Sequence, residues 1–345
     1  MKITSRNHYV PKLYLKHFAS PSGQIYLYRS LVSHVDVPIW KRASLGAVAY
    51  YVDLYTHSAL GAETDEMETW LGKEFESPAE SVIQKVVADR RLTKEDWRVL
   101  IRFAAAQMVR TPAFLLANLP RWNQMMPAVL KQTTANVRRE IDSAKSSGEV
   151  AQTRGFPKPQ YFPIRVTRED DPAKGIAKIT TEVVVGRSLW LYSMRHLLTS
   201  SLEVLHEHRW SILIAPRGIS WPTTDDPVVR LNFRSPTEYD FEGGWARPRA
   251  NILLPLSPRH LLFMQIGERP PEWGTVVSED WAQLIRKILV EHAFRYLFSP
   301  VEDASIPLLR PRVVNADAFQ REMEQWKRWH LEQAQVERSF TERER

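Results

Sequence analysis

The sequence predicts an α+β fold, with a mostly helical N-terminal half and a largely antiparallel sheet in the C-terminal half. Two observations favour this class. Apolar residues recur at helical spacing between residues 63 and 140, whereas residues 209–266 contain short apolar runs separated by Pro and Gly. Strands in one block beside helices in another block are typical of α+β proteins.

The N-terminus is expected to be ordered, as an extended arm followed by a short helix and a strand. Pro11 suits the first position of a helix, and three large apolar side chains follow it at helical spacing. Turn-forming residues at 20–23 end this helix. Residues 24–29 alternate and are rich in aromatics, which indicates a strand, and residues 47–56 are a further candidate strand.

Helical segments are predicted through the middle of the N-terminal half. The first covers residues 63–90, and Pro78 is expected to kink or restart it. The sequence TKED at residues 93–96 resembles a capping box with Asp in place of Glu, and it marks the start of the next helix. Pro112 ends that helix or bends it into another, which runs towards residue 140.

Residues 142–183 are the least regular stretch, and we expect a long exposed connection there, either a domain boundary or an insertion. A helix from about 186 to 206 follows it. Beyond the apolar runs of the sheet, Ser278 is expected to cap a helix, and residues 294–299 are expected to form a last strand.

Length and composition indicate one compact unit with a helical tail. The chain has 345 residues, of which 43% are hydrophobic and 25% charged, as in ordinary globular proteins. We therefore expect a single α+β domain at residues 1–315, which includes the 142–183 excursion, and a charged C-terminal helix at residues 316–345.

Several classes of protein are excluded or disfavoured by composition. The chain has no Cys, which excludes disulfides, Cys nucleophiles, zinc–thiolate sites and iron–sulfur clusters. No apolar run approaches the ~18 residues of a membrane-spanning helix, and the basic N-terminus lacks the apolar segment of a signal peptide. We expect a cytoplasmic protein without a membrane partner.

The charge balance points towards polyanionic partners. Lys and Arg number 47 against 40 Asp and Glu, which gives a formal charge of +7. A basic surface attracts nucleic acid, although the excess is spread along the chain and no block of five or six Lys or Arg forms a basic arm. The 12 Trp residues indicate large packed layers or an aromatic-lined cleft.

Short motifs in a fixed order suggest a family. The opening NHYVPKLYLKHFA resembles the signature N-H-x-x-P-x-x-Y-L-x-x-F of a large bacterial family of unknown function, the DUF4238 family. The further motifs that resemble this family are Glu68, Leu71 and Glu76, then QMVRTP at 107–112, TTDDPVV at 223–229 and PLSP at 255–258. The resemblance covers about residues 6–299, and Thr224 stands where the family has Ser. It implies no established activity.

His8 and two adjacent aspartates are the first candidates for chemistry. A neutral imidazole can act as a general base or a ligand near pH 7, although His8 can equally tie the arm to the domain. Asp225 and Asp226 lie between two predicted strands, where paired carboxylates can bind Mg²⁺ or Mn²⁺. The alternative is that they only form a turn before a Pro.

Glu68 and Glu76 are a second pair of candidate carboxylates. Eight residues of regular helix place them about 80° apart, so they share a broad face. With a His and an Asp they could complete a metal site, whereas the alternative is an ordinary solvated helix face.

Three further residues are candidates for substrate binding. Gln107 and Arg110 are one turn apart near the end of a helix, and Asn7 adjoins His8. Arg110 could hold a phosphate or carboxylate through two hydrogen bonds, or simply complement the helix dipole. His206 and His208 have strand spacing, which could place them on one face as metal ligands or leave them at a helix end.

These residues support two hypotheses about function. The first is a metal-assisted phosphodiester hydrolase, a nuclease-like effector that uses His8, Glu68, Glu76, Asp225 and Asp226 with Mg or Mn. The second is a non-catalytic module that binds nucleic acid or a protein, so the sequence does not decide whether the chain is an enzyme. No phosphate-loop, dinucleotide, nucleophile-elbow or zincin motif is present. We expect His8 beside the turn at 223–229, where a carboxylate would raise its pKa.

Overall fold

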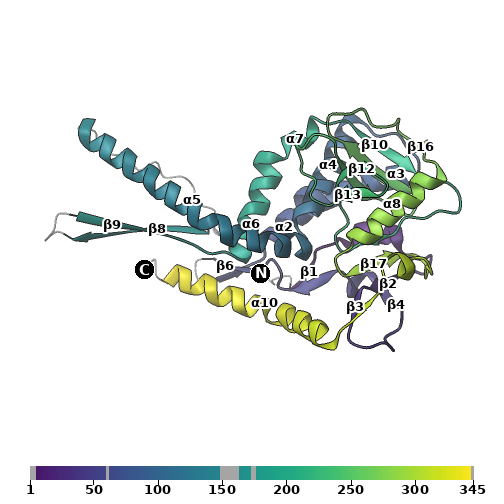
Figure 1. Cartoon of the computed structure of the whole chain (residues 1–345), viewed down its shortest axis with the longest axis horizontal. Coiled ribbons are helices and arrows are strands. Elements are labelled where there is room, and N and C mark those ends of the chain that lie inside the picture. Colours follow the sequence, from purple (N-terminus) through teal and green to yellow (C-terminus); the bar gives the residue numbers. More distant parts are fainter. Residues whose placement is uncertain (1–4, 60–61, 148–162, 172–175, 343–345) are drawn as a thin grey trace.

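The computed structural model describes residues 5–59, 62–147, 163–171 and 176–342. Figure 1 shows a body of sheets and helices from which one helix and one hairpin project. The helices are α1 (Lys12–Leu15), α2 (Glu66–Leu71), α3 (Ser77–Val87), α4 (Lys94–Val109), α5 (Pro112–Ser147), α6 (Arg187–His196), α7 (Glu203–His206), α8 (Glu279–His292), α9 (Ile306–Leu309) and α10 (Ala316–Glu342), with 3₁₀ turns at Lys16–Phe18 and Leu45–Ala47 and π turns at Gly72–Glu76 and Leu197–Ser201.

The strands are short and spread over much of the chain. They are β1 (Arg6–His8), β2 (Gln24–Arg29), β3 (Leu31–Val32), β4 (Trp40–Ser44), β5 (Tyr50–Val52), β6 (His57–Ala59), β7 (Ala62–Thr64), β8 (Ile164–Asp171), β9 (Ile176–Val183), β10 (Trp210–Ile214), β11 (Thr223–Thr224), β12 (Val229–Ser235), β13 (Glu238–Asp240), β14 (Ala250–Pro255), β15 (His260–Gln265), β16 (Thr275–Val276), β17 (Tyr296–Ser299) and β18 (Val313–Val314).

The largest sheet has the order β13-β12-β14-β15-β10-β16. Its pairs are antiparallel except for β10 and β16, which are parallel. One face packs against α8, because Leu253 and Leu261 share a core cluster with Ile285 and Ile288. The alternate residues of the same strands join the main core with α3 and α4. The sheet is thus buried on both faces.

The expected division into a helical N-terminal half and a sheet-forming C-terminal half is wrong. A second sheet has the order β11-β17-β2-β4, so strands from residues 24–44 pair with a strand at 296–299. Strands β1 to β7 all lie before residue 65, and long helices lie in the middle and at the C-terminus. Periodicity indicates each element separately, but strand pairing joins distant segments and is not visible in it.

The helices between residues 66 and 147 follow the expected signals closely. Thr93 begins α4 as a capping box: its side chain accepts the Asp96 N–H at 3.1 Å, and Asp96 accepts the Thr93 N–H at 2.9 Å. Pro78 lies in the first turn of α3, where a missing N–H costs little. α4 and α5 meet at an angle of 59° just before Pro112. Among the described residues, no single helix is long and apolar enough to cross a membrane, and only this bent pair passes that test together.

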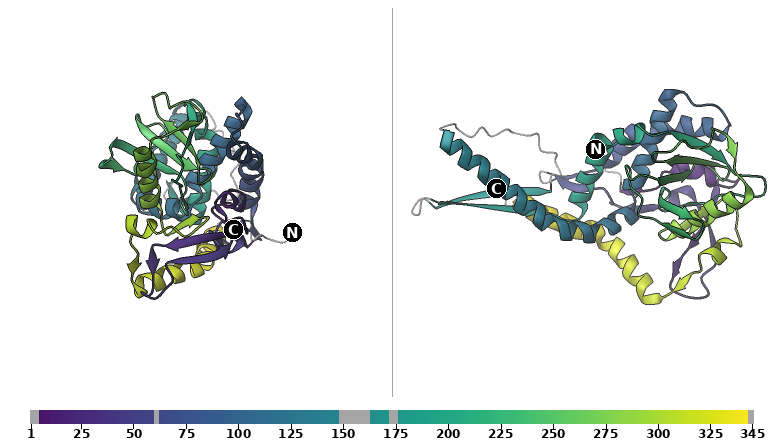
Figure 2. Two further views of the ribbon diagram at one scale, coloured as in Figure 1. Left: turned by 90° about the vertical axis from the view of Figure 1, so that its right-hand side faces the viewer. Right: turned by 45° about the horizontal axis from the view of Figure 1, so that its top comes forward.

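The projecting part of the molecule comes from the segment around residues 142–183. Its described residues form the end of α5 and the antiparallel hairpin of β8 and β9, while residues 148–162 and 172–175 lie outside the description. Thr134 of α5 bonds Thr181 of β9 at 3.1 Å. The right-hand view in Figure 2 shows α5 and the hairpin projecting to the same side of the body, and Arg165 of β8 donates to the Phe340 carbonyl of α10 at 2.5 Å. The domain bounds expected from the sequence stay a prediction.

The ordered N-terminal arm is confirmed. β1 pairs with β5, and Tyr14, Leu15 and Phe18 are completely buried. The Tyr14 hydroxyl donates to the carbonyl of Pro255 and lies 2.7 Å from Thr223 Oγ1. The opening of the chain therefore contacts the large sheet and the strand β11 that precedes the two aspartates.

Candidate functional site

Arg110, at the corner between α4 and α5, joins four distant segments of the chain. Its side chain is completely buried and donates a hydrogen bond to Glu76. Its Nη2 donates to the carbonyl of His8 at 2.7 Å and lies 3.7 Å from Glu68 Oε2. The Tyr55 hydroxyl donates to the Arg110 carbonyl at 2.6 Å. The structure thus brings His8, Glu68, Glu76 and Arg110 together, as the sequence predicts for parts of one site.

The charges in this cluster are largely satisfied within the protein. Burial opposes the positive charge of Arg110, yet the carboxylates of Glu76 and Glu68 raise its pKa above the usual value. Burial raises the pKa of Glu68 to about 7, against the lowering effect of Arg110. The sequence analysis offered phosphate binding as one role for Arg110. Because the guanidinium already has protein partners, it is poorly placed to hold a substrate phosphate.

The expected partnership of His8 with the aspartates is wrong. Burial, followed by the charges of Lys12 and Arg110, lowers the pKa of His8 to about 4, whereas a carboxylate partner would have raised it. The ring packs 5.5 Å from the ring of Tyr50, because β1 pairs with β5 in register with that residue. Its buried Nε2 has no hydrogen bond with any residue that the structure describes.

Asn7 and Gln107 are both completely buried, so neither is exposed for the predicted role in substrate binding. The side-chain oxygen of Asn7 accepts the N–H of Tyr55 at 3.3 Å. Within the described part of the chain, the amide group of Gln107 has no hydrogen-bond partner. Asn7 ties the arm to the segment that carries Tyr55, and Gln107 lies on the same helix as the Arg110 corner.

Asp225 and Asp226 point to different partners. The two oxygens of Asp225 accept the N–H groups of Phe294 and Arg295 at 3.0 and 2.7 Å, which fixes the start of β17. Burial raises the pKa of Asp225 to about 7. Within the described ranges, no group of three or more His, Cys, Asp or Glu residues could hold a metal ion. Both oxygens of Asp225 are engaged by backbone N–H groups, and the expected binding of Mg or Mn at this turn stays a prediction.

Asp226 lines a cavity of about 450 Å³ between the large sheet, α5 and the end of α8. Its Oδ1 accepts the hydroxyl proton of Thr111 at 3.0 Å, which connects it to the corner beside Arg110. Arg230 of β12 and Glu291 and His292 of α8 line the same cavity. Phe114, Phe241 and Phe294 contribute its apolar wall.

His292 faces Asp226 across this cavity. Its Nδ1 donates to the backbone carbonyl of Asp226 at 3.1 Å, so in the neutral ring Nε2 carries the lone pair. Nε2 lies 3.7 Å from Asp226 Oδ2. Burial lowers the pKa of His292 to about 4 and raises the pKa of Asp226 to about 6. At pH 7 the cavity thus contains a neutral imidazole and a largely ionised carboxylate, both of which accept protons.

Arg230 supplies positive charge to the cavity. Its guanidinium makes no hydrogen bond or ion pair with any residue in the described part of the chain, and burial lowers its pKa although Asp226 opposes this effect. Sequence reasoning missed Arg230 and His292. Arg230 is an ordinary polar position in an alternating strand, and His292 ends a helix, so no local signal marks either of them.

His206 and His208 lie apart from this cavity, in a second one near the first turns of α4. His208 Nε2 bonds the Trp245 carbonyl at 3.1 Å, and burial lowers the pKa of His206. Neither of them lies in a group of three or more potential metal ligands among the residues that the structure describes.

The sequence matches a family model over most of its length. The family is described as a protein of unknown function, DUF4238, and its model matches residues 6–303. The chain belongs to this family. The expected resemblance is confirmed, although DUF4238 carries no activity that could be transferred. No curated protein and no solved structure matches the chain.

The residues that suggested the DUF4238 resemblance lie in one connected network. His8, Glu68 and Glu76 surround Arg110, and Thr111 next to it bonds Asp226 at the cavity. Residues from four separate motifs are therefore linked through the α4–α5 corner, with His8 contributing its backbone carbonyl. This is where the geometry favours a functional site.

Proposed function

We propose that the cavity at Asp226 is the active site of a phosphodiester hydrolase that acts on nucleic acid through protein groups alone. The observation that carries this proposal is the placement of Asp226, His292 and the unpaired Arg230 around one cavity of about 450 Å³. Titratable groups with shifted pKa values in a cavity are typical of catalytic sites. A partly buried cation that forms no hydrogen bond or ion pair with the described residues favours an anionic substrate.

Each group has a defined role in the proposed reaction. Arg230 binds a non-bridging oxygen of the phosphodiester and Oδ2 of Asp226 accepts a proton from water, whose oxygen attacks phosphorus. Nε2 of His292 accepts a second hydrogen bond from the same water and orients it. The bond from phosphorus to the leaving oxygen breaks, and Asp226 returns its proton to that oxygen. Water and diester give a monoester and an alcohol.

The pKa of Asp226 suits this role. A general base works best when its pKa lies close to the working pH, and burial raises the pKa of Asp226 to about 6. The Thr111 hydroxyl holds Oδ1 and leaves Oδ2 towards His292. The Arg110 cluster acts through Thr111, so we assign His8, Glu68 and Glu76 to positioning rather than to the chemical step.

The test is cleavage of fluorescein-labelled single-stranded RNA and DNA in the presence of excess chelator. We expect Asp226→Asn to lower the rate by a factor of ~10²–10⁴, the usual contribution of general acid–base catalysis. Arg230→Gln should mainly raise KM, because it removes the substrate-binding cation. Arg234→Ala, in the same strand but with an exposed side chain, is the matched control and should cleave normally.

Two results would overturn this proposal. One is a wild-type protein that binds the oligonucleotides but cleaves neither of them, which would leave the non-catalytic binding module. The other is an Asp226→Asn variant that unfolds at the wild-type temperature and still cleaves at the wild-type rate. The melting curve separates loss of catalysis from loss of fold.

A further inference from the structure

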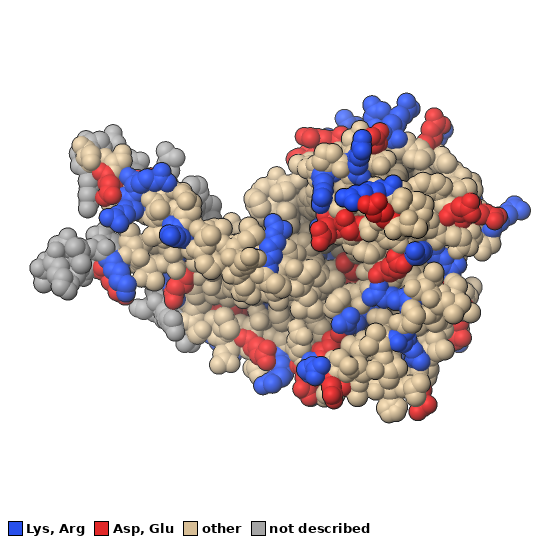
Figure 3. Space-filling model, viewed as in Figure 1, with Lys and Arg blue, Asp and Glu red and all other residues tan. Residues whose placement is uncertain are grey.

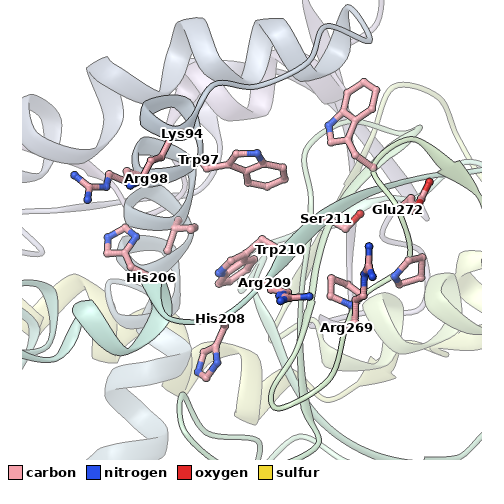
Figure 4. Close-up of a pocket in the computed structure, with 14 residues that line it drawn as sticks. Lys94, Trp97, Arg98, His206, His208, Arg209, Trp210, Ser211, Arg269 and Glu272 are labelled. Atoms are coloured by element: carbon pink, nitrogen blue, oxygen red, sulfur yellow. The ribbon is translucent and has the colours of Figure 1, made fainter.

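A second cavity combines cations with tryptophan rings. It has a volume of about 600 Å³ and lies between the start of α4, the α7–β10 connection and the loop before β16. Its cations are Lys94, Arg98, Arg209 and Arg269, and its indole rings are Trp97, Trp210 and Trp273. Figure 4 shows Trp97 and Trp210 on the α4 side and Arg209 and Arg269 on the loop side.

We propose that this cavity binds a nucleotide of a single-stranded nucleic acid, with a base stacked on tryptophan and the phosphates held by arginine. The site stands apart from the catalysis proposed above, because a strand can bind here whether or not it is cleaved. Sites for single strands combine a positively charged groove with aromatic stacking platforms, which is the combination of this cavity.

The charge of the cavity is strongly one-sided. The residues that line it include four cationic side chains and a single carboxylate, that of Glu272. None of the four forms an ion pair or side-chain hydrogen bond with any of the residues described. On the face in Figure 3, Lys and Arg are interspersed with Asp and Glu, so the net charge of +7 forms no broad basic face there. A local excess such as this cavity is therefore the better candidate for an anion.

The aromatic part of the cavity is accessible, and one of its rings is fixed by a hydrogen bond. Trp97 and Trp210 are half-buried, which leaves ring surface free for stacking. The Nε1 of Trp210 donates to the Leu205 carbonyl at 2.9 Å, and this bond fixes the orientation of its ring. The hydroxyl of Ser211 is buried at the cavity wall without a hydrogen bond to another described residue. Stacking on indole tolerates any base, so we expect little sequence preference.

Two of the arginines that line the cavity, Arg209 and Arg269, are the most suitable for substitution in a binding test. Arg209 and Arg269 are exposed and approach each other in Figure 4, whereas Arg98 points away from the other labelled side chains. Because Arg209 and Arg269 have no protein partners, their removal should not disturb folding. Arg217 is an equally exposed arginine outside this cavity and serves as the matched control.

The test is fluorescence anisotropy of a labelled oligothymidine, an oligoadenosine and labelled AMP at several salt concentrations. We expect Arg209→Ala with Arg269→Ala to weaken oligonucleotide binding more than tenfold at low salt and to lower the salt slope by about 1.4, or ~0.7 per phosphate contact. Trp97→Ala should weaken binding about tenfold even at high salt, where stacking persists. Arg217→Ala should bind as the wild type does.

The competing results are distinct. Wild-type protein that binds no oligonucleotide at low salt overturns the inference, as does an Arg209→Ala, Arg269→Ala variant that binds like Arg217→Ala. If AMP binds as tightly as the oligonucleotides, the proposal that the cavity binds a nucleic-acid strand is overturned, and the cavity is assigned to free nucleotides. Wild-type protein that binds the oligonucleotides through Arg209 and Arg269 but cleaves neither of them supports this site independently of the catalytic one.

Discussion

Replacing Arg110 by Met should destabilise the protein strongly, because it leaves carboxylates with no positive partner. Removing one member of a buried ion pair typically costs ~3–5 kcal/mol. The side chains of Glu68 and Glu76 are 19% and 18% exposed, so water relieves part of the penalty and the lower end applies. The free energy of unfolding should therefore fall by about 3 kcal/mol.

The melting temperature gives the corresponding measurement. At ~2.1 cal/mol/K per residue, 345 residues have an unfolding entropy of about 0.7 kcal/mol/K, so a loss of 3 kcal/mol lowers the melting temperature by about 4 °C. The control Arg234→Ala removes an exposed pair with Glu238 and should shift it by less than about 1 °C. Adding Glu68→Gln to Arg110→Met should recover part of the loss. An Arg110→Met protein that melts like Arg234→Ala would refute the stabilising role of the cluster.

Two further predictions concern the arm and the acidic part of the cluster. Deletion of residues 1–20 removes the buried side chains of Tyr14, Leu15 and Phe18, and loss of one buried aromatic alone costs ~3–5 kcal/mol. The deletion should therefore abolish cooperative melting or lower the melting temperature by more than Arg110→Met does. An unchanged melting curve would contradict the packing of the arm. Burial raises the pKa of Glu68 from 4.5 to about 7, so the folded state binds this proton more tightly than the unfolded state and stability falls as pH rises over that interval. In scanning fluorimetry, the melting temperature of Glu68→Gln minus that of the wild type should therefore increase as the pH rises from about 5 to about 7.5. A difference in melting temperature that stays constant over this interval would argue against a raised pKa of Glu68.

Local signals in the sequence predicted local structure well. The capping box at Thr93 and the cap at Ser278 both form, because a cap depends only on residues three positions away. Residues 164–183 were expected to be irregular, although Ile164 and Val166 in one strand and Ile179, Thr181 and Val183 in the other alternate along one face of the observed hairpin. High polarity concealed a period of two that was present in the sequence.

Long-range structure was harder to predict for a physical reason. The pairing of β2 with β17 joins residues more than 260 positions apart, and nothing in either segment specifies its partner. The same limit applies to the site. Asp226 could be selected because it adjoins a turn, whereas Arg230 and His292 become functional candidates only when a strand and a helix end meet around one cavity.

The cluster around Arg110 lies between these two cases. The sequence selected His8, Glu68, Glu76 and Arg110 by residue type and motif, and the structure brings them together. Phosphate binding by Arg110 would need a free guanidinium, whereas its side chain is completely buried and bonded to Glu76. Residue type indicates what a side chain can do, but burial and partners decide what remains available to a substrate.

The pH dependence of oligonucleotide cleavage in excess chelator tests the central claim most directly. If Asp226 is the general base, kcat/KM should rise with pH through about 6 and level off above it, because its carboxylate must be ionised. Asp226→Asn should abolish this rise, while Arg234→Ala should retain it. A rate that does not change between about pH 5 and pH 7.5, or cleavage that occurs only when a divalent metal is added, would contradict the account.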